Sequence, residues 1–308
     1  MKLELTSFYS KICAIGVILV VGFFLGKLKL ISDKTNRELT NLLLTIFMPA
    51  SLLVAFPTTY DSALAEFFFS GLFAGAIVIV ALIIISRLIF NRRWTRRELR
   101  LESQFALIFN NATFLGYPII VNTFNLDGIL AYCGFIVIFN IALFSYGIWL
   151  FEQKLSFSLI KKVIFNPNII AVLLGMIVFL TSFSLPKPLI DAVSYVGNAT
   201  TPLSLICIGY MLSQAKLLKT FAKWRLILAA AIQLLIGPLI TWSILKLCQF
   251  PLEVVYVCTL IQSLPTATSL GLFATKYGGN ISESSELVVI STLLSAITMP
   301  LMTFFLLR

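Results

Sequence analysis

The chain has 308 residues, of which 59% are hydrophobic and only 12% are charged, and its net charge is +10. Ordinary soluble domains contain about 45–50% apolar and about 25% charged residues, so a water-soluble globule, a disordered chain and a nucleic-acid-binding domain are excluded. The composition indicates an all-α integral membrane protein, and the excess of basic residues needs an explanation of its own.

Ten apolar stretches follow one another along the chain, each close to the roughly 20 residues that cross a bilayer. The first lacks a small-residue cleavage site, so we interpret it as a retained helix rather than a signal peptide. The connections are short and leave no room for a soluble domain. The expected spans are 8–28, 38–56, 66–90, 101–124, 128–151, 167–185, 190–213, 225–247, 252–276 and 286–307.

Two of these spans are interrupted by polar residues, glycine and proline. The fourth carries FNNATFLGYPII at 109–120, and the ninth carries IQSLPTATSLG at 261–271. Glycine tolerates unusual backbone angles and proline cannot donate a backbone hydrogen bond. Irregular backbone at membrane depth survives only where it is buried in protein or lines a wet cavity. We therefore predict that the two segments form a transport site.

The candidate substrate-binding residues come from these segments, with one addition from the fifth span. They are Asn110, Asn111, Thr113, Gly116, Pro118, Asn140, Gln262, Ser263, Pro265, Thr266 and Thr268. Half-helices that begin after Asn111 and after Pro265 would aim N–H groups and partial positive charge at the protein centre, which suits a carboxylate or another small anion. The competing interpretation is that the prolines only kink packed helices. Other polar residues in spans, such as Gln233 and Ser291, are expected to tie helices together.

The second half of the chain repeats features of the first at an offset of 153 residues. Gly22 falls on Gly175, the segment 49–52 falls on 202–205, and Thr113 falls on Thr266. Each half contains five spans, an odd number, so the halves enter the membrane from opposite sides. We predict two inverted five-helix repeats, 1–155 and 156–308, an architecture typical of secondary transporters.

Basic residues are distributed unevenly between the two sides of the predicted bundle. Eighteen of the 23 Lys and Arg residues fall on one side, which we expect to be cytoplasmic. The prediction is a multi-pass protein of the cytoplasmic (plasma) membrane with both termini extracellular. The cluster NRRWTRRELR at 91–100 fits a topology anchor with Trp94 at the interface, and a nucleic-acid or acidic-lipid patch is the less favoured alternative.

The chain contains no histidine, and its five cysteines form no CxxC pair. Catalytic groups, a metal site and a disulfide framework are therefore not expected, and we predict that the protein is not an enzyme. No Asp or Glu lies deep in any span, which weakens a proton-carrying carboxylate mechanism. No cofactor is expected, and the coupling ion, Na⁺ or H⁺, is left open.

Several segments resemble the auxin efflux carrier family of membrane transporters, within the wider group that includes bile-acid sodium symporters. They are FMPASLL at 47–53, NATFLGYPI at 111–119, NPNIIAVLLG at 166–175, VGNATTPLSLICIGYML at 196–212 and LPTATSLGLFATKYG at 264–278. The resemblance covers nearly the whole chain. It implies ten helices, a crossing of the broken fourth and ninth helices, and elevator-like alternating access. Sodium-dependent relatives carry a glutamate near the ninth-helix crossing, where this chain has Gln262 and Ser263.

These observations together predict a secondary active transporter for a small organic anion such as malate, malonate or another carboxylate. The short loop at 152–166 resembles bacterial permeases more than plant members. The alternatives are a passive anion channel or uniporter, and an exporter of an auxin-like aromatic carboxylate. The expected partners are the substrate and the lipid bilayer, not nucleic acid, and a homodimer is left open.

Overall fold

The computed structural model describes residues 5–57, 59–91, 97–153, 161, 163–183, 185–214 and 223–306. Within these ranges every regular element is a helix, and the only strand-like pairing is an isolated bridge between Asn110 and Thr266. An all-helical arrangement follows from the composition, because a helix satisfies its own backbone hydrogen bonds in lipid. Trp94 and most of its basic cluster lie outside the described residues.

The helices of the first half, with η marking π-helical turns, have the following bounds. They are α1 Leu5–Lys27, α2 Asp33–Leu42, η1 Leu43–Phe47, α3 Met48–Val54, α4 Ser62–Ile89, α5 Arg97–Ile108, η2 Ala112–Gly116, α6 Tyr117–Thr123, α7 Leu126–Ala142, η3 Leu143–Gly147 and α8 Ile148–Glu152. Those of the second half are α10 Pro167–Thr181, α11 Lys187–Asn198, α12 Thr200–Ser213, α14 Trp224–Leu247, α15 Leu252–Gln262, α16 Leu270–Tyr277 and α17 Ile281–Leu306.

Each expected apolar span coincides with one helix or with a run of consecutive helices. The fourth and ninth spans are broken, as the sequence predicts. The seventh, expected as one helix over 190–213, is instead divided at Ala199 into α11 and α12. Pro202 lies in the first turn of α12, where its missing N–H costs no helical hydrogen bond. The break therefore lies just upstream of the proline.

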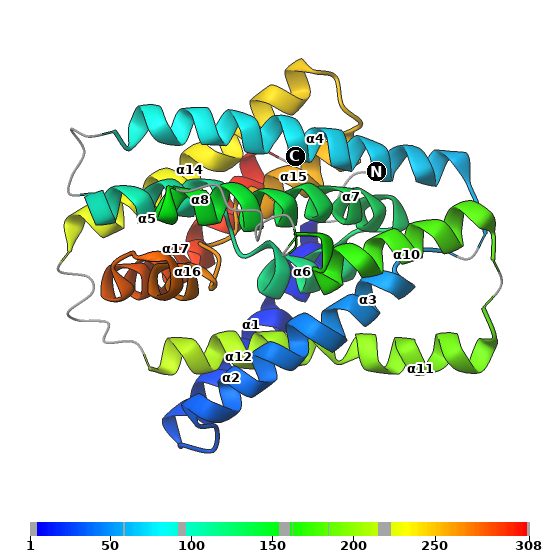
Figure 1. The fold of residues 1–308 in the computed structure, drawn as a ribbon, viewed down its shortest axis with the longest axis horizontal. Helices are drawn as coiled ribbons and strands as arrows, with labels where there is room; N and C mark the ends of the chain where they lie inside the picture. Colours follow the sequence, from blue (N-terminus) through cyan, green and yellow to red (C-terminus); the bar gives the residue numbers. More distant parts are fainter. Residues whose placement is uncertain are drawn as a thin grey trace.

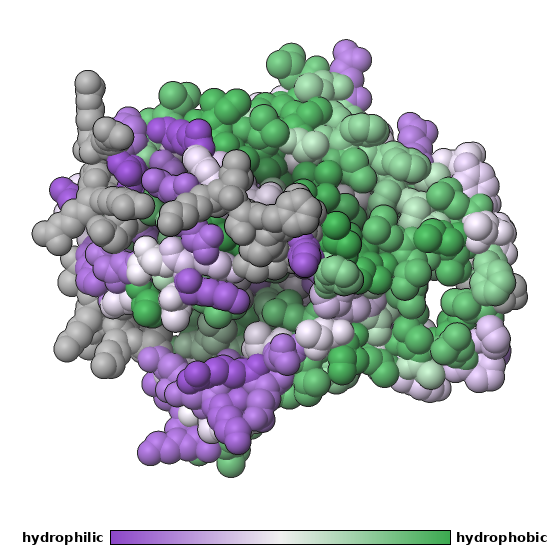
Figure 2. Space-filling model, viewed as in Figure 1, coloured by the Kyte–Doolittle hydropathy of each residue, from purple (hydrophilic) through white to green (hydrophobic). Residues whose placement is uncertain are grey.

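Five segments of the described chain are long and apolar enough to cross a membrane. They are Asp33–Val54, Ser62–Ile89, Leu126–Glu152, Trp224–Leu247 and Ile281–Phe305. Three shorter apolar helices accompany them, at Cys13–Lys27, Pro167–Thr181 and Leu252–Gln262. Figure 2 shows a hydrophobic surface over the middle of the molecule and hydrophilic residues gathered at its left end, over the start of α2 and around α16. This distribution is that of a multi-pass membrane protein.

The helices divide into two packed sets. The smaller set contains α1, α2–α3, α10, α11 and α12, in which α1 packs on α12, and α3 packs on both α10 and α11. The larger set contains α4, α5–α6, α7–α8, α14, α15–α16 and α17, in which α4 packs on α7, and α14 packs on α15 and α17. Figure 1 shows α12, α11, α2 and α3 along the lower part of the molecule and α4 along the opposite edge. The site described below lies where the two sets meet.

The contact between α1 and α12 depends on a glycine. A Cβ atom on Gly22 would lie 2.5 Å from the backbone oxygen of Ile206, so the two helices approach as closely as a glycine allows. We expect Gly22→Ala to force the helices apart and to cost about 1–3 kcal/mol of folding stability. Thermal unfolding of the detergent-solubilised protein measures this loss.

Gly16 of the same helix provides the matched control. No atom lies within 4 Å of the position where its Cβ would be. Gly16→Ala should therefore leave the melting temperature unchanged or raise it slightly, since alanine favours a helix over glycine by up to about 1 kcal/mol. Equal shifts for the two variants would show that the α1–α12 contact is not tight.

Candidate functional site

The broken centres of the fourth and ninth spans pair with each other through their backbones. The N–H of Asn111 donates to the carbonyl oxygen of Pro265 at 2.7 Å, and the N–H of Ala267 donates to the carbonyl oxygen of Phe109 at 3.0 Å. These two bonds form the isolated antiparallel bridge between Asn110 and Thr266. They replace helical hydrogen bonds that the breaks remove, which is what allows unwound backbone to lie inside a membrane protein.

Side chains reinforce the crossing from several helices. The Asn110 amide Nδ2 donates to Gln262 Oε1 at 2.6 Å. Gln233 of α14 donates through Nε2 to the Leu264 carbonyl oxygen at 2.9 Å, and its Oε1 accepts from Thr266 Oγ1 at 2.9 Å. The N–H of Thr266 donates to Ser291 Oγ of α17 at 3.1 Å. Gln233 and Ser291 therefore do tie helices together, and what they hold is the crossing itself.

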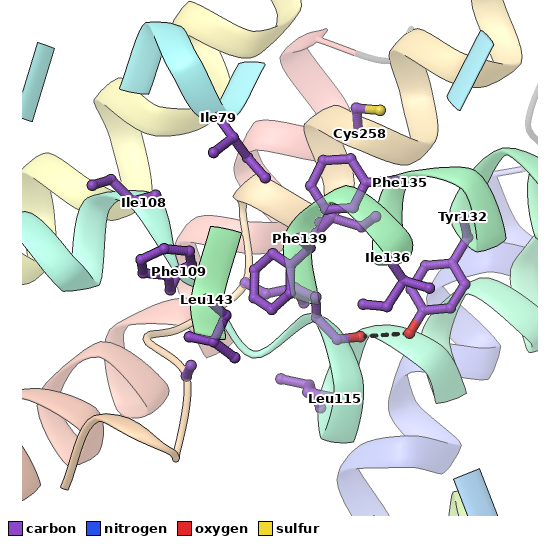
Figure 3. Packing of buried hydrophobic residues seen from close by; sticks show 14 of the residues in the cluster. Ile79, Ile108, Phe109, Leu115, Tyr132, Phe135, Ile136, Phe139, Leu143 and Cys258 are labelled. Carbon is purple, nitrogen blue, oxygen red and sulfur yellow. Dashed lines mark hydrogen bonds between the residues drawn. The ribbon is translucent and has the colours of Figure 1, made fainter. Parts of the chain in front are cut away.

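Aromatic residues of α7 support the first break from the other side. The Tyr132 hydroxyl donates to the Ala112 carbonyl oxygen at 3.1 Å, and the ring of Phe139 meets that of Phe109 edge-on at 5.7 Å between centroids. Figure 3 shows both contacts, with Phe135 and Ile136 on the same helix. All these rings are buried, so the break is enclosed by close-packed apolar side chains.

Two details of the predicted site are wrong. The second half-helix of the ninth span begins at Leu270, not directly after Pro265, because residues between them bond to α14 and α17 instead of forming a helix. Gly116 has ordinary helical angles, φ −66° and ψ −51°, so it is not needed for an unusual conformation. Its role is a close approach, since a Cβ there would lie 3.0 Å from Leu264 Cδ1.

A cavity of about 230 Å³ lies beside the crossing, between the two helix sets. The smaller set contributes Asn41 and Thr45 from α2 and η1, and the larger set contributes Asn140 from α7. None of the described residues that line this cavity is charged, and their polar groups are amides and hydroxyls. A solute in it would be recognised by hydrogen bonds and by the ends of helices.

Three helix N-termini converge on this cavity. The first is that of η2 and α6, capped by Asn111, whose Oδ1 accepts from the Phe114 N–H at 3.2 Å. The second is that of α10, where Asn166 Oδ1 accepts from the N–H groups of Asn168 and Ile169. The third is that of α16, whose N-cap Ser269 lines the cavity. Each N-terminus carries a partial positive charge, so the cavity attracts an anion although it contains no cation.

One buried donor in the cavity has no partner. Asn111 uses Oδ1 to cap its own helix, which leaves Nδ2 without a hydrogen bond, and the residue is only 2% exposed. Two buried acceptors, Asn110 Oδ1 and Asn168 Oδ1, are also unpartnered and belong to cavity-lining residues. An unsatisfied buried polar atom costs about 1–3 kcal/mol. A ligand that accepts from Asn111 would recover that cost.

The structure brings some of the predicted site residues to the cavity and places the others in the support of the crossing. Asn110, Asn111, Thr113, Asn140 and Thr268 line the cavity. Gln262, Pro265 and Thr266 bond to the first break or to α14 and α17. Ser263 donates to its own helix at Thr259, and Pro118 begins α6. The predicted residues therefore have two different roles.

Three asparagines of the cavity were missed by the sequence analysis as site candidates. Asn41, Asn166 and Asn168 line the cavity, and the NPN pattern at the start of the sixth span was the available signal. Glu102 of α5 is fully buried and accepts from the Asn280 N–H at 2.9 Å, while its Oε2 has no partner. It lies at the α16–α17 junction and not in the cavity. No group of three or more Cys, Asp or Glu able to hold a metal occurs in the described part of the chain.

Two further cavities lie between the crossing cavity and one end of the bundle, and neighbouring cavities share lining residues. One, of about 430 Å³, shares Asn41, Thr268 and Ser269 with the crossing cavity and is also lined by Arg37. The next, of about 380 Å³, is lined by Asp33 and by residues of α12, α16 and α17. This end carries the starts of α2 and α17 and the end of α12. Arg37 thus supplies a positive charge to the cavity next to the crossing cavity.

The known proteins to which this chain is similar are named as transporters. The sequence profile of a family described as "Membrane transport protein" matches residues 7–156 and, a second time, residues 153–303. An "Uncharacterized transporter" of Methanocaldococcus jannaschii is 23% identical over 307 residues, which cover 95% of this chain and 96% of that protein. One of Methanothermobacter thermautotrophicus is 24% identical over 301 residues, which cover 94% and 95%. A "Putative malonate transporter" of Rhizobium meliloti is 28% identical over 145 residues, which cover 46% and 44%.

Proposed function

Because the chain belongs to the membrane transport protein family, whose members are transporters and not enzymes, we propose that it is a secondary active transporter of a small organic anion. One observation carries this proposal. Three helix N-termini and the unpartnered Asn111 amide meet in one cavity between two helix sets. A carboxylate there would accept from Asn111 and would be stabilised by the helix ends.

The size of the cavity favours a small carboxylate. A volume of about 230 Å³ lies below the range of about 300–1,000 Å³ typical of sites for drug-sized ligands. Malonate and malate both fit within this space. The name of the Rhizobium meliloti relative agrees with this class. We therefore propose a dicarboxylate of three or four carbon atoms as the substrate.

The packing of the two halves supports ten helices in two inverted repeats. The family profile matches each half separately. The first span packs on the seventh, α1 on α12, and the sixth packs on the second, α10 on α3. Gly22 and Gly175, which share one repeat position, each lie at such a contact, against Ile206 and Phe56. Reciprocal packing of this kind is expected when two copies of one unit face each other.

Alternating access would then be a movement of the larger helix set, which carries the crossing, against the smaller set. With the end rich in basic residues taken as cytoplasmic, the cavities between the crossing and the starts of α2 and α17 are what an inward-facing state would have. The substrate would travel with the crossing and lose access to this end when the sets move.

Uptake of radiolabelled malonate and malate into proteoliposomes tests the proposal. A carrier should show saturable uptake, and malonate loaded inside the vesicles should accelerate entry of the label. Flux that never saturates and is indifferent to internal malonate would indicate a channel and would contradict alternating access. Imposing a Na⁺ gradient and a pH gradient in separate experiments identifies the coupling ion.

A further inference from the structure

A further polar cavity lies at the end of α4 and the start of α5, and it shares no lining residue with the crossing cavity. It has a volume of about 470 Å³ and is lined by two arginines, Arg87 and Arg100, together with Trp149 of the α8 helix. Asn91, Gln104 and Gln153 supply further polar groups, and none of the described residues that line it is acidic. We refer to it as the arginine groove. Nothing in the proposed transport mechanism uses it.

Arg87 is held in place by aromatic rings. Its guanidinium carbon lies 5.0 Å from the centroid of Trp149 and 5.5 Å from that of Tyr146, and its Nε donates to the Tyr146 hydroxyl at 3.2 Å. A guanidinium has five N–H donors in a planar fork, so one bond to Tyr146 leaves the outer edge of the fork available. Stacking on rings fixes its orientation without neutralising its charge.

Neither arginine is paired with a carboxylate among the residues that the structure describes. Arg100 is half-buried, so its charge is partly removed from water. Two cations that face one groove repel each other unless an anion lies between them. Among the described residues the groove thus holds two positive charges and no counter-charge, and a phosphate group with its several acceptor oxygens would supply one.

The surface next to the groove indicates which kind of molecule carries the phosphate. Apolar residues of α4 at helical spacing are exposed and form a stripe that ends one residue beyond Arg87. They are Phe69 (43% exposed), Phe73 (59%), Ile77 (38%), Val80 (56%), Ile84 (55%) and Leu88 (68%). Figure 1 shows α4 along the edge of the molecule, and Figure 2 shows hydrophobic residues over this edge. An acyl chain can lie along this stripe while its headgroup reaches the arginines.

We propose that the arginine groove binds the phosphate of an anionic phospholipid on the side expected to be cytoplasmic. Anionic lipids are enriched in that leaflet, and basic pockets between membrane helices bind their headgroups. The sequence cluster at 91–100 begins beside this groove, so a specific lipid site would add to its role as a topology anchor. Bound lipid would join α4, α5 and α8 at one end of the larger helix set.

The test measures thermal stability of the full-length protein in detergent with three additives: short-chain phosphatidylglycerol, short-chain phosphatidylcholine and inorganic phosphate. A ligand that binds the native state raises the melting temperature by mass action. Phosphatidylglycerol should raise it more than phosphatidylcholine, and native mass spectrometry should detect bound phosphatidylglycerol. Arg87→Gln and Arg100→Gln should each weaken the apparent affinity for phosphatidylglycerol at least tenfold.

Arg225→Gln is the matched control, because Arg225 also stacks on a tryptophan, Trp224, at 5.3 Å, but lies outside the groove. It should keep the full response to phosphatidylglycerol. If an Arg87→Gln variant fails to fold, Arg87→Lys, which keeps the charge but loses the planar fork, should still bind more weakly than wild type. Equal responses to the two lipids, or an unchanged response in the groove variants, would overturn the proposal. If only inorganic phosphate raised the melting temperature, and did so only with both arginines present, the ligand would be free phosphate and not a lipid.

Discussion

Replacing Asn111 with alanine should reduce the affinity for malonate about 10- to 150-fold. The side chain offers an unpartnered amide donor that is almost fully buried at a helix N-terminus in the crossing cavity. A hydrogen bond to a charged group contributes about 1.5–3 kcal/mol, and each 1.4 kcal/mol changes affinity about tenfold. The Michaelis constant for malonate uptake into proteoliposomes measures the loss.

Asn111 also caps its helix, so the alanine variant combines a lost donor with a lost cap. Asn111→Asp separates the two effects, because aspartate is as good an N-cap as asparagine. It keeps an oxygen for the Phe114 N–H but removes the donor and adds a negative charge. We expect near-normal stability and no malonate transport.

Asn122→Ala is the control, since among the described residues the Asn122 side chain of the same helix bonds to the Pro118 carbonyl oxygen alone and lies outside the cavity. Normal transport by both Asn111 variants would show that the substrate lies elsewhere.

The positions of the spans could be predicted because apolar length is a local property. The stretch 225–247 agrees with α14, Trp224–Leu247, and 8–28 agrees with α1, Leu5–Lys27. The breaks could also be located, since Asn110 and Asn111 interrupt the apolar fourth span and Pro265 cannot continue a helical hydrogen-bond ladder in the ninth. A lipid-embedded helix has few other ways to end, so proline and asparagine in an apolar run are strong signals.

The start of the second half-helix could not be predicted, because it depends on distant partners. The sequence allows a helix to begin at Thr266, directly after Pro265. In the structure, however, the Thr266 hydroxyl donates to Gln233 and its N–H donates to Ser291, on two other helices. The helix therefore begins only at Leu270. The break at Ala199 is similar, since Thr200 and the Gly197 carbonyl bond to Ser51 of α3. Tertiary hydrogen bonds decide these boundaries.

The cavity was only partly predictable for the same reason. Asn110, Asn111 and Thr113 could be identified because they interrupt an apolar span. Asn166 caps α10 and Asn168 lies in its first turn, so the NPN pattern at 166–168 has the form of an ordinary helix start and does not by itself indicate a site. Their position depends on how the smaller helix set packs against the crossing. The anion-attracting property of the cavity comes from this assembly of helix ends rather than from any single motif.

Gln233→Leu should be the most damaging single substitution at the crossing. Gln233 is 1% exposed and bonds at once to the Leu264 carbonyl oxygen and the Thr266 hydroxyl. Leucine has a similar volume but would leave both groups buried without this partner, at about 1–3 kcal/mol for each. The ninth-span segment would no longer be held in place for its pairing with Asn111. We expect a clearly lower melting temperature and loss of malonate uptake.

Thr241→Val is the matched control on the same helix. Thr241 is fully buried, but its hydroxyl donates to the Gly237 carbonyl oxygen within α14 and to no other helix. Removing it leaves no group of the crossing unsatisfied, so transport should persist and stability should change by less than about 1 kcal/mol. If Gln233→Leu behaved like Thr241→Val, the crossing would be held by its backbone bonds alone. A loss of transport in Gln233→Leu but not in Thr241→Val would instead show that α14 positions the unwound segment beside the cavity where the three helix ends converge.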